Sequence, residues 1–152
     1  MISKFLQAGL AALVSSVLFV SAAQAHWSLD NEASSLSFVT VKAEHVAEAH
    51  SFDRLSGTIG DNGDVEITIE LASVNTMIQI RNERMQEMLF ETNMFPEATI
   101  SGSIDLDALT DMDAGASAAR QIDFELSLHG QSVALAADVQ ITRTGEGVVV
   151  ST

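Results

Sequence analysis

The sequence contains no cysteine and no tyrosine, one proline and one tryptophan, and only seven lysine and arginine residues against 21 aspartate and glutamate residues. The absence of cysteine excludes disulfides, a thiol nucleophile and thiolate metal ligands. The shortage of cations argues against nucleic-acid binding, because a protein that holds phosphates needs lysine and arginine to neutralise them. Of the 152 residues, 47% are hydrophobic and only 18% are charged, with a formal net charge of −14. This composition is typical of one folded domain and not of a disordered acidic tail.

The first 25 residues have the pattern of a secretory signal peptide. Lys4 gives the basic start, residues 10–20 are mostly apolar, and Ala23-Gln24-Ala25 has the small-x-small form of a cleavage site. A retained membrane anchor is the alternative, since the apolar run is nearly long enough to span a bilayer. We predict cleavage, a mature domain of residues 26–152, and a location in a bacterial periplasm.

Alternating apolar and polar residues predict a mostly antiparallel β domain. Residues 64–71 read Asp-Val-Glu-Ile-Thr-Ile-Glu-Leu, which places the apolar side chains on one face of a strand. Similar or weaker patterns occupy residues 36–42, 52–59, 98–106, 122–128, 133–141 and 147–151. Asn62-Gly63, which favours a type I′ turn, and His129-Gly130 separate neighbouring runs. One-sided strands joined in sequence order predict an up-and-down β-barrel, which hides their apolar faces.

Three segments depart from this alternation. Residues 80–90 are rich in helix formers and predict one short helix, which Asn82 is placed to cap and which ends before Pro96. Residues 110–119 predict a mobile surface loop. Residues 147–152 end the chain on an apolar strand, whose bare edge suggests a truncated sequence or a partner that covers it.

No known catalytic motif is present, and no catalytic residue, cofactor or enzymatic activity is predicted. The segment 44–50 is a weak metal-site candidate, because it contains His45, His50 and two glutamates, and His26 begins the mature chain. The spacing is poor, however, since a helix sets His45 and His50 about 140° apart and a strand points them to opposite faces. A polar loop or barrel rim is the alternative interpretation of this segment.

The interior of the predicted barrel is a stronger candidate for a binding site. A barrel of about eight strands is wide enough to hold one elongated small ligand. Each buried methylene contributes about 0.8 kcal/mol, so ten contribute roughly 8 kcal/mol, which corresponds to micromolar affinity before the costs of ordering. The alternative is that phenylalanine, isoleucine and leucine side chains fill the barrel themselves.

Several segments together resemble the YceI-like family of periplasmic proteins. They are Trp27-Ser28-Leu29-Asp30 with Ser35–Phe38, His50–Ile59, Ser73–Thr76 with Arg81–Met85 and Leu89-Phe90, Phe95–Ile100, and Leu126–Gly130. The resemblance implies a lipocalin-like antiparallel barrel with a helix near one end. It also implies binding of a long amphiphile, such as a polyisoprenoid or a quinone-like lipid, by a carrier rather than an enzyme. Members of the family continue beyond the position of Thr152, which implies a barrel that is incomplete at its C-terminal end here.

Three functional hypotheses follow. The first is a periplasmic lipid-binding protein with a lining of Phe38, Phe52, Ile67, Ile69, Ile100, Ile104, Phe124, Leu126 and Leu128, and with Phe90 and Phe95 near one mouth. Arg81 and Arg84 are candidates for contact with an anionic headgroup, the alternative being ion pairs with Glu83 and Glu87 along the helix. The second is a metal-handling protein that uses the histidines. The third is an interaction module that dimerises or binds a partner through its exposed C-terminal edge strand.

Overall fold

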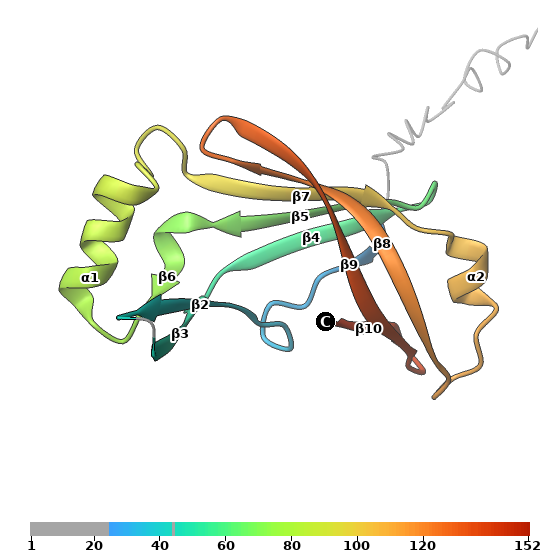
Figure 1. Cartoon of the computed structure of the whole chain (residues 1–152). Coiled ribbons are helices and arrows are strands. Elements are labelled where there is room, and N and C mark those ends of the chain that lie inside the picture. Colours follow the sequence, from blue (N-terminus) through green and yellow to red (C-terminus); the bar gives the residue numbers. More distant parts are fainter. Residues whose placement is uncertain (1–24, 44) are drawn as a thin grey trace, which may run out of the picture.

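The computed structural model describes residues 25–43 and 45–152 of the chain (Figure 1). The predicted signal peptide therefore lies outside the described residues, apart from Ala25. Within the described part, no helix has the length and the apolar character needed to cross a membrane.

A curled antiparallel sheet forms the body of the molecule. Its seven strands are, in spatial order, β1 (Ala25–Ser28), β4 (Leu55–Gly60), β5 (Asp64–Glu70), β7 (Glu97–Ser103), β8 (Ser117–Leu128), β9 (Gln131–Arg143) and β10 (Val148–Ser151). The sheet curves into a half-barrel, with β1 and β10 as its edges (Figure 1). The predicted antiparallel, barrel-like β fold is confirmed.

A second, three-stranded sheet packs at one end of the half-barrel. It consists of β2 (Leu36–Lys42), β3 (Val46–Phe52) and β6 (Val74–Asn75). The strands therefore do not follow one another strictly in sequence order, because β1 pairs with β4 and the β2–β3 hairpin leaves the main sheet. The prediction of a single strand over residues 52–59 is also wrong, because the chain passes from β3 of the small sheet to β4 of the main sheet within this range. The strand is broken at Asp53-Arg54, where the Asp53 N–H donates to the Ser73 carbonyl (3.1 Å).

The predicted helix is present as α1 (Gln79–Arg84), which continues into a π-helical turn, η3 (Met85–Leu89). Asn82 does not cap it, because Ile78 occupies the N-cap position. The Asn82 Oδ1 instead accepts hydrogen bonds from the backbone N–H (2.9 Å) and the hydroxyl (2.6 Å) of Thr76. The helix is thereby tied to the strand that precedes it.

Two further boundaries differ from the sequence expectations. The strand predicted over residues 98–106 ends at Ser103 as β7, and residues 106–110 form a short helix, α2 (Leu106–Thr110), that was not predicted. The Asp105 carboxylate starts this helix by accepting from the Ala108 N–H at 3.1 Å. The predicted loop over residues 110–119 is shorter than expected, because β8 begins at Ser117.

A single-turn helix, η2 (Leu71–Ser73), connects β5 to β6.

Both predicted turns join hairpins. His129 and Gly130 have φ angles of 53° and 72°, as a two-residue type I′ turn between β8 and β9 requires. The turn between β4 and β5 is of a different type from the prediction, because Gly63 has a positive φ (87°) and Asn62 does not. A type I turn closed by a left-handed glycine uses this arrangement.

The hydrophobic core is divided between the two ends of the half-barrel. At the α1 end, Ile69, Leu71 and Ala98 are buried, and side chains of both sheets pack around them. At the α2 end, Leu109 packs against Val139 and Ile141. The middle of the inner face is covered by neither cluster.

Candidate ligand-binding site

The strand register aligns apolar side chains in rows across the inner face of the half-barrel. One row runs from Ile67 on β5 through Ile100 and Leu126 to Val133 on β9. Because directly opposed residues in antiparallel strands point to the same face, these four side chains form one continuous strip. A parallel row consists of Val65, Gly102, Phe124 and Leu135.

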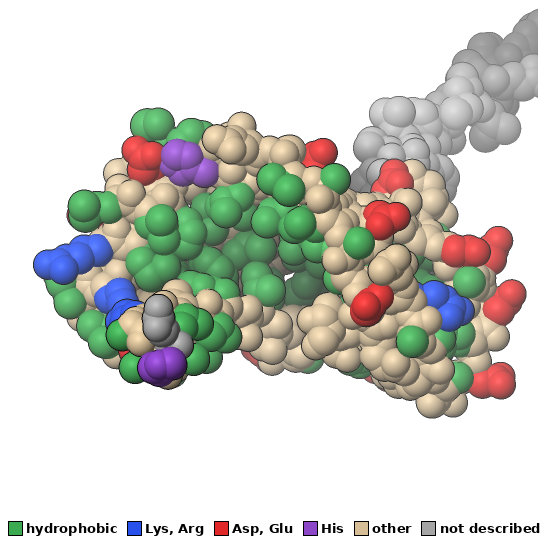
Figure 2. Space-filling model, in the orientation of Figure 1, with side chains coloured by type: hydrophobic (Ala, Val, Ile, Leu, Met, Phe, Trp, Pro, Cys, Tyr) green, Lys and Arg blue, Asp and Glu red, His purple; other side chains and the backbone are tan. Residues whose placement is uncertain are grey.

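These two rows line an open hollow. In the space-filling view, hydrophobic side chains cover the floor of a cavity that is open between the two ends of the molecule (Figure 2). Val133 and Leu135 remain 53% and 42% exposed. Gly102 contributes to the hollow by its lack of a side chain, because its position faces Phe124 on the neighbouring strand. A soluble domain ordinarily buries such a strip, so its exposure marks a binding surface.

The predicted lining residues divide into two groups in the structure. Ile67, Ile100, Phe124 and Leu126 lie on the floor of the hollow, and Ile100 also packs against the core at the α1 end. The others pack at its ends. Phe52, Ile69, Phe90 and Leu128 belong to the core at the α1 end, and Ile104 packs with the core at the α2 end. Those side chains shape the walls of the hollow, and Ile69 is itself buried.

Two residues of the floor, Val133 and Leu135, were not among the predicted lining. Their alternation in the sequence identifies one apolar face of a strand. That alternation does not distinguish a face that packs from a face that stays open. Their exposure follows from tertiary structure, since no part of the described chain covers these two side chains.

An aromatic cluster closes the α1 end of the hollow. The rings of Phe38 and Phe52 lie with centroids 5.3 Å apart, and Phe52 lies 5.8 Å from Phe90. On the other side of Phe38, the buried His50 ring lies at 5.2 Å, and its Nε2 is 2.9 Å from the Thr40 hydroxyl. The inner face of the β2–β3 hairpin therefore changes from aromatic to polar towards its tip.

Arg81 is already engaged by groups of the protein. One guanidinium nitrogen donates to Glu48 Oε2 on β3 (2.9 Å), and another donates to the Thr76 carbonyl (2.6 Å). Lys42 contacts the same Glu48 oxygen at 2.7 Å. The hydrogen bond from Lys42, aided by the positive charge of Arg81, lowers the pKa of Glu48 below its usual value.

The two arginines that were predicted to contact a headgroup therefore differ in whether an acidic side chain already binds them. Arg81 does not pair with Glu83 or Glu87 along the helix, because the hairpin brings Glu48 to it. Arg84 is exposed on α1. The side chain of Glu83 instead accepts a hydrogen bond from Gln79 at 3.0 Å.

Phe95 lies where the loop before β7 meets the β8–β9 turn. Its ring centroid is 4.2 Å from that of His129, and His129 Nε2 is 2.6 Å from a carboxylate oxygen of Glu91. Glu91 and His129 both have positive φ angles, of 50° and 53°. These contacts connect the segment after α1 to the hairpin that carries one side of the hollow.

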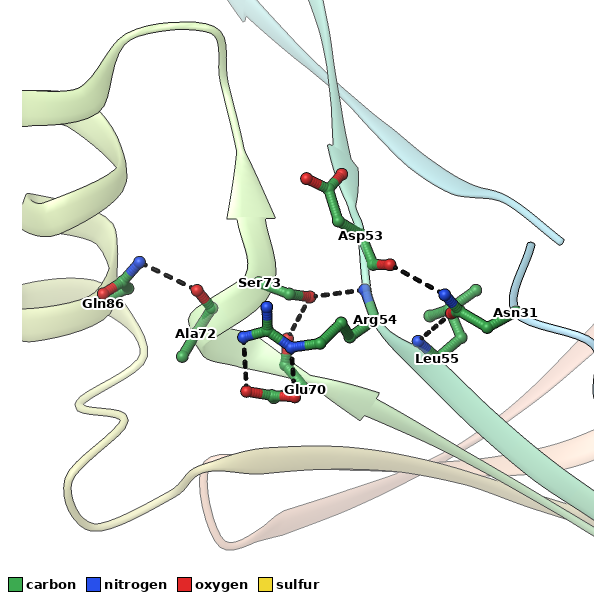
Figure 3. A network of polar contacts seen from close by, with 8 residues as sticks. All are labelled: Asn31, Asp53, Arg54, Leu55, Glu70, Ala72, Ser73 and Gln86. Atoms are coloured by element: carbon green, nitrogen blue, oxygen red, sulfur yellow. Dashed lines mark hydrogen bonds and ion pairs between the residues drawn. The ribbon is translucent and has the colours of Figure 1, made fainter.

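A polar network fixes the α1 end to the main sheet (Figure 3). Arg54 and Glu70 form two parallel hydrogen bonds of 2.6 Å, which raise the pKa of the guanidinium and lower that of the carboxylate. The buried Ser73 hydroxyl accepts from the Arg54 N–H (3.0 Å) and donates to the Glu70 carbonyl (2.6 Å). The Gln86 side chain donates to the Ala72 carbonyl at 3.0 Å, which adds the helix to the network.

The metal-site candidates receive no structural support. His45 is exposed in the turn before β3, whereas His50 is 5% exposed and contacts Thr40 and Phe38. The side chain of His26 lies outside the described part. Among the side chains that the structure describes, no group of three histidines or acids is arranged to hold a metal ion.

Comparison with known proteins identifies the family to which this fold belongs. The family model of the YceI-like domain matches residues 27–152. The chain belongs to the YceI-like family, as its sequence motifs predicted. No curated protein matches the chain.

Solved structures agree with this assignment. A polyisoprenoid binding domain from Saccharophagus degradans, implicated in plant cell wall breakdown, is 37% identical with a TM-score of 0.81, over 84% of this chain and 74% of that chain. Burkholderia cenocepacia BcnA is 21% identical with a TM-score of 0.52, over 74% and 69% of the two chains. The Campylobacter jejuni YCEI protein is 20% identical with a TM-score of 0.52, over 82% and 74%. The last two show similarity of fold alone.

Proposed function

We propose that this protein is a periplasmic carrier or buffer of a long amphiphile, such as a polyisoprenoid or a quinone-like lipid, and that it binds its ligand without catalysis. The exposed apolar floor of the hollow carries this proposal. A hydrocarbon chain laid along the rows of Ile67 and Phe124 removes apolar surface from water on both partners. The similarity to the polyisoprenoid binding domain supports the ligand class. The signal-like segment of residues 1–25 supports export.

The surroundings of the hollow favour a neutral or weakly polar headgroup. Arg81 is held by Glu48 and Thr76, so an anionic headgroup would have to compete with an existing ion pair. Arg84 is the remaining cation on the helix. The overall charge of −14 opposes a multiply charged ligand such as a pyrophosphate. A quinone or an alcohol carries no such penalty.

Native mass spectrometry of protein purified from its source tests the proposal. We expect an additional mass that corresponds to one long hydrocarbon-bearing molecule per chain, which organic extraction removes. Titration of the extracted protein with a polyisoprenol and with its pyrophosphate then compares the two headgroups, and we expect the alcohol to bind more tightly. Protein that purifies without a ligand and binds neither compound would refute the proposal.

The edge of the main sheet supports a second candidate, association by strand addition. Among the described strands, β10 pairs with β9 alone, and Val149 and Val150 are 55% and 52% exposed. A free edge offers backbone donors and acceptors to another strand. If the protein dimerises there, Val149→Pro abolishes the dimer in analytical ultracentrifugation. A wild-type protein that is monomeric at high concentration would exclude this candidate.

A further inference from the structure

The segment from β6 to β7 carries a cluster of exposed apolar side chains at the α1 end, which we call the α1 rim. It consists of Met77, Ile78, Ile80, Met88, Leu89 and Met94. Three of them are methionines with exposed fractions of 87%, 76% and 67%. Single exposed apolar residues are ordinary, but six within 18 residues of sequence are a concentration of the kind that marks an interaction surface. Methionine is common on such surfaces because its flexible side chain adapts to varied partners.

The backbone at Met77 holds this side chain outward at a cost. Its φ angle is 62°, a left-handed conformation that non-glycine residues seldom adopt. The conformation is fixed by the Asn75 side chain, which accepts from the Met77 N–H at 3.0 Å, and by the bonds between Thr76 and Asn82. A strained backbone conformation that neighbouring contacts maintain indicates a functional role for that residue.

The α1 rim lies on the outer side of the wall that closes the α1 end of the hollow. Phe90 follows the exposed Leu89 directly and packs inward against the ring of Phe52. Gln86 is bonded inward to Ala72, while Met88 points to solvent. The same short segment thus has one side on the end of the apolar hollow and the other side exposed.

Charge is distributed unevenly between the two ends of the molecule. Aspartates gather in and beside α2, namely Asp105, Asp107, Asp111 and Asp113. The exposed cations Lys42, on β2, and Arg84, on α1, belong to elements at the α1 end. Glutamates are present at that end as well: Glu48, Glu83, Glu87 and Glu91. Glu48 is bound by Arg81 and Lys42, and Glu91 is bound to His129.

We propose that the α1 rim docks on the surface of a lipid bilayer, where the protein exchanges its ligand with the membrane. Apolar side chains of a surface helix insert among the headgroups and upper acyl chains, while Arg84 contacts a lipid phosphate. The acidic α2 end is repelled by anionic lipids and turns away. A bilayer is preferred to a second copy of this chain as the occupant, because the inference rests on the proposed function, whose ligand is a lipid that membranes hold.

Vesicle flotation with extracted, ligand-free protein tests the docking. The vesicles contain phosphatidylethanolamine and phosphatidylglycerol, or phosphatidylcholine alone. The test variant is Met77→Asn, Met88→Gln, Met94→Gln, because asparagine accepts a left-handed backbone and all three side chains are exposed. Val149→Thr is the control, since it removes an apolar side chain of similar exposure on β10. We expect the wild type and the control to float and the triple variant to partition at least tenfold more weakly.

Further measurements separate docking from ligand binding. The triple variant should take up a polyisoprenol from detergent micelles as the wild type does, since its changes lie outside the hollow. Wild-type protein that takes up the lipid but does not float, or a triple variant that floats equally well, would overturn the docking and leave the proposed function standing. Flotation without lipid uptake would support docking and refute the proposed function. A dimer that the triple variant converts to a monomer, without flotation, would assign the rim to a second copy instead.

Discussion

Replacing the two exposed side chains of the β9 floor, Val133→Thr and Leu135→Thr, should weaken ligand binding strongly while leaving the fold intact. Full burial of such a side chain contributes roughly 1.5–3 kcal/mol. Val133 and Leu135 are 53% and 42% exposed, so a ligand that covers both gains about half of that from each. The sum, roughly 1.5–3 kcal/mol, corresponds to a 10- to 100-fold change in the dissociation constant. The hydroxyl groups oppose burial further.

Equilibrium titration with a fluorescent prenyl lipid measures this change. The matched control is Val149→Thr, because Val149 is equally exposed but lies opposite Thr142, on the other face from Ile141 and the hollow. Both proteins should unfold near the wild-type temperature, since exposed substitutions alter stability by about 0.5 kcal/mol or less. If the double variant binds the lipid as tightly as the wild type, the ligand does not lie on the floor of the hollow, and the assignment of the site is wrong.

Three further predictions concern stability. Glu70→Gln removes a carboxylate whose pKa Arg54 lowers from the usual 4.5. The stability that this pair gives the wild type is therefore present at neutral pH and is lost as the pH falls through the pKa of the folded state. The melting temperatures of the two proteins should differ at neutral pH and converge as the pH falls below about 4.5. Ser73→Ala leaves the Arg54 N–H without its acceptor in a part-buried site and should cost roughly 1 kcal/mol in urea unfolding. An unchanged midpoint would mean that the hydroxyl contributes nothing to stability. Gly63→Ala places a Cβ 2.2 Å from the Ile104 carbonyl oxygen, at a residue whose φ is 87°. It should lower the free energy of unfolding by more than about 2 kcal/mol. A decrease of only about 0.3 kcal/mol would contradict this geometric argument.

Some elements followed from local sequence alone. The alternation over residues 64–71 predicted β5, and the helix formers over residues 80–90 predicted one helix, which the structure forms as α1 and a π-helical turn. His129-Gly130 was expected to turn, and it does so with the positive φ angles of a tight hairpin. Local patterns succeed here because period and turn chemistry act over a few residues. Boundaries were less well predicted, as at α2, where Asp105 starts a helix that the apolar alternation did not reveal.

The partners of charged side chains were not readable from sequence spacing. Arg81 was expected to contact a headgroup or a glutamate on its own helix, yet it contacts Glu48, 33 positions away. His50 was considered as a metal ligand or a rim residue, yet it is buried between Phe38 and Thr40. Such contacts depend on how the β2–β3 hairpin folds over the end of the main sheet. That packing brings together residues that are far apart in the sequence, and their spacing in the sequence does not predict that they are close in space.

The sequence by itself determined that the chain forms a β domain with one-sided apolar strands, and its motifs identified the YceI-like family. Only the tertiary structure decided which apolar faces are buried. Ile69 and Ile141 carry the same pattern as Val133 and Leu135, but the first two are core residues and the last two line an open hollow. The physical reason is that alternation specifies which way a side chain points from its strand, whereas burial depends on whether another element packs over it. Curvature and the positions of α1 and α2 close the ends of the half-barrel and leave its middle open (Figure 1).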